Sequence, residues 1–284
     1  MRSLTSSENQ MKHGLMPRKA LSFILSMAVG IGLVTAGEGV YAGPDGRALM
    51  EKMAESRKLD GSEAVVKMKI YSASNQVRER KIKLATKLYD NGKTEKRVYK
   101  FLEPADVKGT GVLVFDYDKK ADDMWIFLPA LRKTRRVVSS EKSKSFMGSE
   151  FTYGDLNIPS LDDYTYKFLR EEGAGGETCY LIEVVPANDS VKKEEGYSKK
   201  LLWLSKKSHA IRQGHFFGLD GKLAKVLTTR NVKQLDAAKD RWRPMYMEMV
   251  NKTNGRKSVF ETEKVAVTPN TKDEYFTTRY IERP

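Results

Sequence analysis

The sequence predicts a mainly β protein built on one large, curved antiparallel sheet. Apolar and polar residues alternate with a period of two along most of the chain. Turn signals at residues 90–93, 220–221 and 253–255 separate such runs, and short turns join antiparallel neighbours. Because no helical segments alternate with the strands, a doubly wound α/β fold is excluded. One face of each strand is apolar, so the sheet must cover its inner face or close on itself.

Residues 1–42 have the architecture of a secretory signal peptide. Two basic residues precede an apolar run at residues 20–36, and small residues behind this run predict cleavage after Ala42. A transmembrane anchor is the alternative interpretation, but the run of about 17 residues is at the lower limit for spanning a bilayer. We therefore expect an exported chain with one mature domain at residues 43–284.

The mature domain opens with a helix, which about twelve strands follow. In residues 47–58, Leu49, Met50 and Met53 fall on one face at helical spacing. A second short helix is expected at residues 273–281. The strands are expected at residues 66–71, 81–88, a run that ends at 102, 111–117, 124–128, 132–138, 164–170, 178–185, 199–205, 211–218, 223–234, 241–251 and 258–267.

The composition excludes several classes of protein. The 284 residues include 51 Lys+Arg against 37 Asp+Glu, a net charge of +14, and 40% of them are apolar. That apolar fraction is too high for a disordered chain. One cysteine excludes a disulfide scaffold, and three histidines leave little for a metal site, so we expect no metal and no cofactor. In an exported protein the positive charge indicates membrane components or an acidic partner rather than nucleic acid, and a general role in solubility is the open alternative.

Residues 139–161 break the alternation of the strands. Long segments without regular structure are uncommon in compact domains and are often functional. Two interpretations remain open: an ordinary surface loop with a few anchoring aromatic residues, or a lid or plug over the open apolar face. The segment mixes charged residues with Phe146, Met147, Phe151, Tyr153 and Leu156.

Two motifs around this segment resemble the outer membrane lipoprotein-sorting protein family. They are MWIFLPALRKTRRV at residues 124–137 and SFMGSEFTYGDL at residues 145–156, and KFLEPADVKGTGVLVFDY at residues 100–117 belongs to the same pattern. The family is a LolA-like group within the LolA/LolB superfamily of periplasmic carriers. The resemblance covers essentially the whole mature chain.

The resemblance implies both a fold and a class of function. The fold is an incomplete, half-open β-barrel of about eleven strands, plugged by short helices and a loop. The function is to hold a hydrophobic ligand, such as the acyl chains of lipoproteins, while it crosses the periplasm. Members of this branch are often associated with inner-membrane transporters of the resistance-nodulation-division (RND) type. The sequence departs from the well-studied carriers in length and in its PALRKTRR segment, so no single ligand-binding residue is transferred from them.

Apolar residues around the segment are the candidate ligand-binding and lid residues. Methionine and aromatic side chains suit adaptable apolar pockets, but they are also ordinary core residues. Burial in the core is the simpler interpretation for Trp125 and Phe127, whereas Phe146 and Met147 are better placed to act as a mobile gate. The full candidate set is Trp125, Phe127, Phe146, Met147, Phe151 and Tyr153.

Four basic residues form the second candidate site: Arg132, Lys133, Arg135 and Arg136. Arginine binds carboxylates and phosphates through two parallel hydrogen bonds. The four residues could form a polar rim that contacts a lipid head group or an acidic partner. Alternatively, they could pin the segment through ion pairs with Glu141, Glu150 or Asp155.

We expect a periplasmic carrier or chaperone for lipoprotein acyl chains or another lipid, in transit towards the outer membrane. The alternative is a non-carrying accessory protein that docks on an inner-membrane RND-type transporter through its basic face. An enzyme is not expected, because the sequence has no G-x-S-x-G elbow, no catalytic Cys–His arrangement and no glycine-rich phosphate loop.

Overall fold

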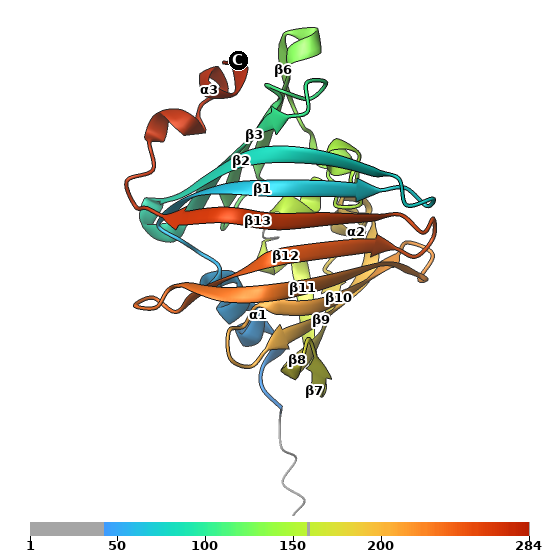
Figure 1. Cartoon of the computed structure of the whole chain (residues 1–284). Coiled ribbons are helices and arrows are strands. Elements are labelled where there is room, and N and C mark those ends of the chain that lie inside the picture. Colours follow the sequence, from blue (N-terminus) through green and yellow to red (C-terminus); the bar gives the residue numbers. More distant parts are fainter. Residues whose placement is uncertain (1–42, 158–159, 284) are drawn as a thin grey trace, which may run out of the picture. The chain divides into compact units, whose positions relative to one another are not determined.

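The computed structural model of the protein describes residues 43–157 and 160–283. The expected signal peptide at residues 1–42 lies outside the described residues. Within them, thirteen strands form one curved antiparallel sheet that is not closed into a barrel, and three short helices accompany the sheet (Figure 1). The mainly β, half-open fold is therefore confirmed. None of the described helices has the length and hydropathy that a membrane span requires.

The helices and strands have the following bounds: α1 (Gly46–Ser56), β1 (Gly61–Tyr71), β2 (Val77–Tyr89), β3 (Thr94–Glu103), β4 (Gly111–Tyr117), β5 (Asp123–Leu128), β6 (Lys133–Arg136), β7 (Tyr164–Ala174), β8 (Glu177–Pro186), α2 (Asp189–Glu195), β9 (Tyr197–Ser205), β10 (Ile211–Gly218), β11 (Leu223–Asp236), β12 (Arg241–Asn251), β13 (Lys257–Val267) and α3 (Thr278–Glu282). The sheet has two strands more than the resemblance implied, because each alternating run of the sequence forms a strand of its own, down to the four-residue β6.

The sheet consists of two antiparallel meanders, one of β1 to β6 and one of β7 to β13, and the pairing of β1 with β13 joins them. The order is β6-β5-β4-β3-β2-β1-β13-β12-β11-β10-β9-β8-β7. Neighbours in the sheet are neighbours in sequence, except that β1 pairs with β13. Because β6 and β7 stand at opposite edges, the segment between them must cross from one edge of the curved sheet to the other. This crossing explains why residues 139–161 break the strand alternation.

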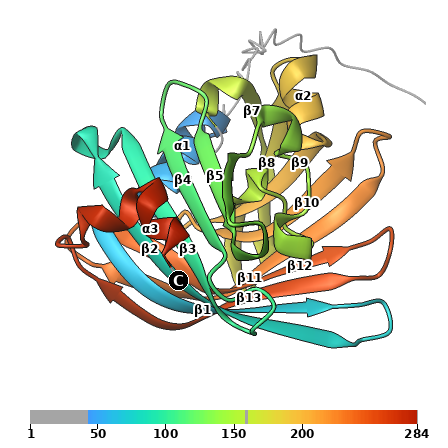
Figure 2. The same cartoon turned by 90° about the horizontal axis from the view of Figure 1, so that it is seen from above.

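Irregularities in strand pairing bend the sheet. Register shifts interrupt the pairing of β1 with β13, β2 with β3, β7 with β8, β9 with β10, β10 with β11 and β11 with β12. A β-bulge bends its strand and increases the local twist. The sheet consequently wraps around a concave face, which Figure 2 shows from above.

The concave face of the sheet carries the main apolar core. On β1, Val66, Met68 and Ile70 are buried there. Lys67 and Lys69 alternate with them and reach the convex face, where they pair with glutamates of β13 at 2.9 and 3.8 Å. The alternation of apolar and polar residues that predicted the strands thus also separates the buried face of the sheet from its solvent-exposed face.

Helix α1 covers the concave side near β7, β8 and β9. The carboxylate of Asp45 caps the helix by accepting hydrogen bonds from the backbone N–H groups of Arg47 and Ala48 at 3.1 and 3.2 Å. Leu49, Met50 and Met53 then pack in one cluster with buried residues of β7, β8 and β9. The helix lies within two residues of the range that the sequence predicted.

The C-terminal segment packs on the convex side, next to β4 and β5 (Figure 2). Extended backbone at Thr277 divides the expected helix over residues 273–281 into a 3₁₀ turn at Asp273–Phe276 and the short helix α3. Phe276 and Ile281 are buried there. A Cβ atom at Gly111 would lie 2.5 Å from the Cβ of Ile281, so this close approach requires glycine.

Candidate functional site

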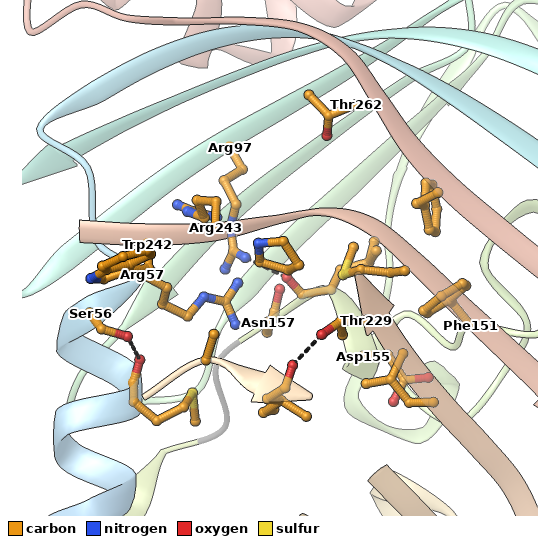
Figure 3. Close-up of a pocket in the computed structure, with 18 of the residues that line it drawn as sticks. Ser56, Arg57, Arg97, Phe151, Asp155, Asn157, Thr229, Trp242, Arg243 and Thr262 are labelled. Atoms are coloured by element: carbon orange, nitrogen blue, oxygen red, sulfur yellow. Dashed lines mark hydrogen bonds between the residues drawn. The ribbon is translucent and has the colours of Figure 1, made fainter. Parts of the chain in front are cut away.

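A cavity of about 300 Å³ opens on the concave face of the sheet. Its walls come from α1, from β1–β3 and from β7–β13. Residues 151–157, part of the segment between β6 and β7, also line it (Figure 3). Small-molecule sites in proteins have volumes from about 300 to about 1,000 Å³, so the cavity can hold a ligand.

The lining of the cavity is mostly apolar and includes five methionines. Met50 and Met53 project from α1, and Met245, Met247 and Met249 alternate along β12. Methionine is unbranched and polarizable, so its side chain adapts to apolar ligands of different shape. Other apolar lining residues include Leu59, Val66, Ile82, Leu84, Phe151, Leu156, Leu202, Phe216, Leu227 and Phe260.

Three arginines form a polar part of the lining. Arg57 follows α1, Arg97 lies on β3 and Arg243 lies on β12, and Figure 3 shows the three side chains extending into the same part of the cavity beside Asn157. Burial, together with the charges of Arg243 and Arg97, lowers the pKa of Arg57 to about 10. Arg57 therefore stays protonated at neutral pH.

Glu95 on β3 bridges two of the arginines. Arg243 donates to Glu95 Oε1 at 3.2 Å, and Arg97 Nε lies 3.8 Å from Glu95 Oε2. Burial alone would raise the pKa of Glu95, but Arg97, Arg243 and Arg57 lower it below its ordinary value. Arg97 also bonds to the carboxylate of Asp116 and to the carbonyl of Leu156. The buried network thereby ties the crossing segment to β3.

Asp122 extends this network towards the loop between β4 and β5. Asn157 Nδ2 donates to Asp122 Oδ2 at 2.6 Å, and the backbone N–H of Tyr117 donates to Oδ1 at 3.2 Å. Burial and the charge of Asp116 raise the pKa of Asp122 to about 6. The Asp122 carboxyl group consequently changes protonation state at a higher pH than an ordinary aspartate does, around pH 6.

The crossing segment fills the concave face with aromatic rings. The side chain of Phe146 is 0% exposed. Its ring centroid lies 5.8 Å from that of Tyr99, 6.1 Å from Phe101, 5.6 Å from Tyr153 and 6.3 Å from Phe260. The segment is thus packed as a plug against β3 and β13.

Glu150 anchors the same segment to β11, β12 and β13. Its backbone N–H donates to Ser258 Oγ at 2.9 Å, and its carbonyl accepts from Lys225 Nζ at 2.6 Å. Asn251 Nδ2 donates to the Glu150 carboxylate at 2.8 Å, and Arg256 Nε lies 3.1 Å from it. Polar contacts therefore fix the segment at the opposite side from the Arg97 network.

The candidate apolar residues from the sequence occupy three different environments. Phe151 lines the cavity, and Phe146 and Tyr153 are buried in the adjacent core. Met147 is half-buried at the margin of that core. Trp125 and Phe127 alternate with the concave residues of β5, so they pack on the convex face near the C-terminal segment. Whether any of the six residues contacts a ligand stays a prediction.

The candidate basic residues divide into two pairs. Arg135 Nη1 lies 2.7 Å from Glu141 Oε2, and Arg136 pairs with Asp123. Arg132 and Lys133 are exposed at the turn between β5 and β6, with no ion-pair partner among the described residues. Of the three acidic partners that the sequence offered, Glu141 is the one in contact; Glu150 pairs with Arg256, and Asp155 accepts from the backbone N–H of Thr152 at 2.8 Å.

The sequence analysis missed the arginines that line the cavity, although a signal for them exists. Arg57 is four residues after Met53 on the apolar face of α1. Arg243 is in phase with the three methionines of β12, and Arg97 is in phase with Tyr99 on β3. An arginine at an apolar position of an amphipathic element indicates a polar site inside the fold.

The described residues offer little for metal or nucleophile chemistry. Among them, no group of three or more His, Cys, Asp and Glu residues is arranged to hold a metal ion. Cys179 is fully buried, and burial raises the pKa of its thiol to about 11. The thiol is therefore protonated and inert at neutral pH.

Comparisons with solved structures place the chain among known proteins. A protein described as an outer membrane lipoprotein-sorting protein domain, from Vibrio parahaemolyticus, is 30% identical, with a TM-score of 0.76, and the match covers 84% of this chain and 98% of that one. A DUF1329 family protein from Desulfovibrio piger is 28% identical, with a TM-score of 0.76 over 83% of this chain and 97% of that one.

A third solved structure and two sequence comparisons bear on the fold and the family of the chain. A LolA superfamily protein from Nitrosomonas europaea shares the fold at 21% identity and a TM-score of 0.62, over 84% of this chain and 99% of that one. A family profile described as "uncharacterized protein" matches residues 93–283, and a search of curated proteins gave no significant match. The chain therefore belongs to the outer membrane lipoprotein-sorting protein family, which its motifs at residues 124–137 and 145–156 indicate.

Proposed function

We propose that the protein is a periplasmic carrier that binds lipoprotein acyl chains, or another lipid, in the cavity and transfers them towards the outer membrane. The observation that supports the proposal most directly is the apolar cavity on the concave face, with methionines in its lining and the crossing segment packed beside it. The protein then acts by binding and release, without chemistry on the ligand.

The physical properties of the cavity suit a carrier. Burying an acyl chain contributes about 0.8 kcal/mol per methylene, so about ten buried methylenes contribute about 8 kcal/mol. A carrier must also release its ligand. Methionine side chains favour both steps, because they pack against an acyl chain and rearrange when the chain leaves.

Isolation of the protein from producing cells tests the proposal. We expect native mass spectrometry of the detergent-free protein to show a bound lipid, and extraction to identify it. A fluorescent dodecanoyl probe should bind the delipidated protein at one site. Protein that carries no lipid and does not bind the probe would contradict the carrier function.

A pair of variants on β1 links probe binding to the cavity. Ala64 lines the cavity, whereas the neighbouring Val65 points to the opposite face of the strand. Ala64→Phe should reduce the affinity for the dodecanoyl probe by filling space, while Val65→Phe should leave it unchanged. Equal effects of the two substitutions would place the bound probe outside the cavity.

The second candidate is a non-carrying accessory protein that docks on an inner-membrane RND-type transporter. Arg132 and Lys133 favour this alternative, because they are exposed at one turn, have no ion-pair partner within the described residues, and are available to an acidic partner. Two results together would support the accessory role over the carrier role. The protein should be free of lipid and copurify with the transporter, and reversing both charges should abolish this copurification.

A further inference from the structure

We propose that the cavity takes an amphiphile with an anionic head group, a carboxylate or a phosphate, and that Arg57 binds this head group beside Arg97 and Arg243. The inference rests on the proposed function, because it names the class of ligand that the carrier would hold. Its basis is an arginine that has no hydrogen-bond or ion-pair partner among the described residues and that extends into a mostly apolar cavity.

Arg57 reaches the cavity from the end of α1. It follows the last residue of the helix on the face that also carries Met50 and Met53, and its guanidinium extends into the cavity (Figure 3). Within residues 43–157 and 160–283, no hydrogen bond or ion pair involves this guanidinium. Arg97 and Arg243, in contrast, both contact carboxylates.

The nearby carboxylates are already engaged by the other arginines. Glu95 lies between Arg97 and Arg243, and Asp116 bonds to Arg97. Three guanidinium groups therefore share two carboxylates in this part of the cavity. Of these three guanidinium groups, that of Arg57 has no direct partner among the residues that the structure describes.

Two further acidic side chains near the cavity also have partners. Asp122 accepts hydrogen bonds from Asn157 and from the backbone of Tyr117. Asp155 accepts a hydrogen bond from the backbone N–H of Thr152 at 2.8 Å. Because the nearby carboxylates already have partners, an anion that enters from solution could pair with Arg57.

The chemistry of the arginines selects the head group. A guanidinium presents parallel N–H donors that match the oxygens of a carboxylate or a phosphate. The Nε atoms of Arg97 and Arg243 are also buried without a hydrogen-bond partner among the described residues. An uncompensated charge away from bulk water is costly, so a bound anion would remove that cost.

The apolar walls provide the place for the tail of the amphiphile. Arg243, Met245, Met247 and Met249 share one face of β12, and six residues of extended strand span about 20 Å. A head group at the arginines therefore places an acyl chain along the methionines. A free anion would make no use of these walls, and a neutral lipid would make no use of Arg57.

Ligands with one chain length and different head groups test the inference. The purified, delipidated protein is titrated with dodecanoate, dodecyl phosphate, dodecan-1-ol and dodecylammonium, by displacement of the fluorescent dodecanoyl probe. We expect the affinity for each anion to exceed the affinity for the alcohol by at least about tenfold, because a charge-assisted hydrogen bond contributes that much binding energy. Dodecylammonium should bind most weakly, and inorganic phosphate alone should not displace the probe.

Variants assign the preference to Arg57. Arg57→Gln should reduce the affinity for both anions about tenfold and leave the affinity for dodecan-1-ol unchanged. Arg57→Lys should retain part of the preference, because it keeps the charge. Arg279→Gln removes the same charge from the exposed surface of α3 and should leave every affinity unchanged. Since Arg57 has no hydrogen-bond or ion-pair partner in the described part of the chain, its variants should not lower the melting temperature.

The outcomes separate this inference from the proposed function. Equal affinities for the anions and the alcohol, or an anion preference that persists in Arg57→Gln, would overturn the head-group site and leave the carrier function standing. Binding of none of the four amphiphiles would overturn both. Displacement of the probe by inorganic phosphate alone would show an anion site unrelated to lipid and would also overturn the inference.

Discussion

Phe146 and Met147 are neighbours in sequence, but their surroundings differ. Phe146 is fully buried among four aromatic rings. Met147 is half-buried, and its φ of 50° puts the backbone in the left-handed region. Arg80 on β2 holds the carbonyl of Met147 by a hydrogen bond. The two side chains should therefore contribute differently to stability and to ligand exchange.

We expect Phe146→Ala to lower the free energy of unfolding by about 3–5 kcal/mol, because it leaves a cavity between the rings. Met147→Ala should lower it by less than about 1 kcal/mol and should speed release of the dodecanoyl probe if the residue gates the cavity. Urea unfolding and stopped-flow release measure the two effects. Release from Met147→Ala at the wild-type rate would contradict the gate.

Asp122 gives the protein a pH dependence whose sign follows from its pKa of about 6. Between about pH 4 and about pH 6 the folded protein binds more protons at Asp122 than the unfolded chain does. This carboxyl group therefore lowers stability as the pH rises through that range. Asn157 Oδ1 is buried without a hydrogen-bond partner among the described residues, so it can accept from an amide placed at position 122.

Asp122→Asn should raise the free energy of unfolding by about 1 kcal/mol at about pH 7.5, because the buried charge is removed. The difference from wild type should disappear below about pH 3, where Asp122 is protonated in both states. Urea unfolding of the two proteins across this range checks the prediction. A variant that is less stable than wild type at every pH would contradict it.

At the scale of elements, the turn between β5 and β6 separates two kinds of basic residue. Arg135 and Arg136 pair with acidic residues, whereas Arg132 and Lys133 do not pair within the described part of the chain. The two interpretations of the basic motif therefore apply to different residues. Arg135 and Arg136 are placed to pin the chain through ion pairs, whereas Arg132 and Lys133 are placed to contact a partner.

Reversing the charges of each pair tests this division. Arg135→Glu with Arg136→Glu should lower stability by less than about 1 kcal/mol per ion pair, since exposed pairs contribute little. Arg132→Glu with Lys133→Glu should leave the melting temperature unchanged and weaken association with an acidic partner or anionic vesicles, an effect that salt should reduce. Equal loss of association in both double variants would refute the division.

At the scale of the whole molecule, we expect export to decide which ligands the protein meets. We expect the protein from the periplasmic fraction to begin at Gly43, because the apolar run at residues 20–36 and the small residues Val40 and Ala42 have signal-peptide architecture. N-terminal sequencing of fractionated cells measures this directly. An intact N-terminus in the inner membrane would contradict a freely diffusing carrier.

The pattern of apolar, polar and turn residues along the sequence was sufficient to predict most helices and strands of the fold. Period-two alternation and turn residues marked the strands, and helical spacing marked α1 within two residues. The exceptions were α2, which the sequence analysis did not predict, and residues 273–281, where Thr277 interrupts the helix and packing against β4 fixes the two pieces. The motifs also indicated the family and the half-open sheet, because they depend on residues that are close in sequence.

The sequence by itself determined the strands, their antiparallel neighbours and an apolar face that needs cover. Only the tertiary structure decided that β1 pairs with β13, which sends the segment between β6 and β7 across the concave face. The same long-range pairing brings Arg57, Arg97 and Arg243 together from three distant elements. The packing of the C-terminal segment decides what covers Trp125 on its face of β5. Periodicity is set by neighbours a few residues apart, whereas such convergence depends on contacts between residues far apart in the chain.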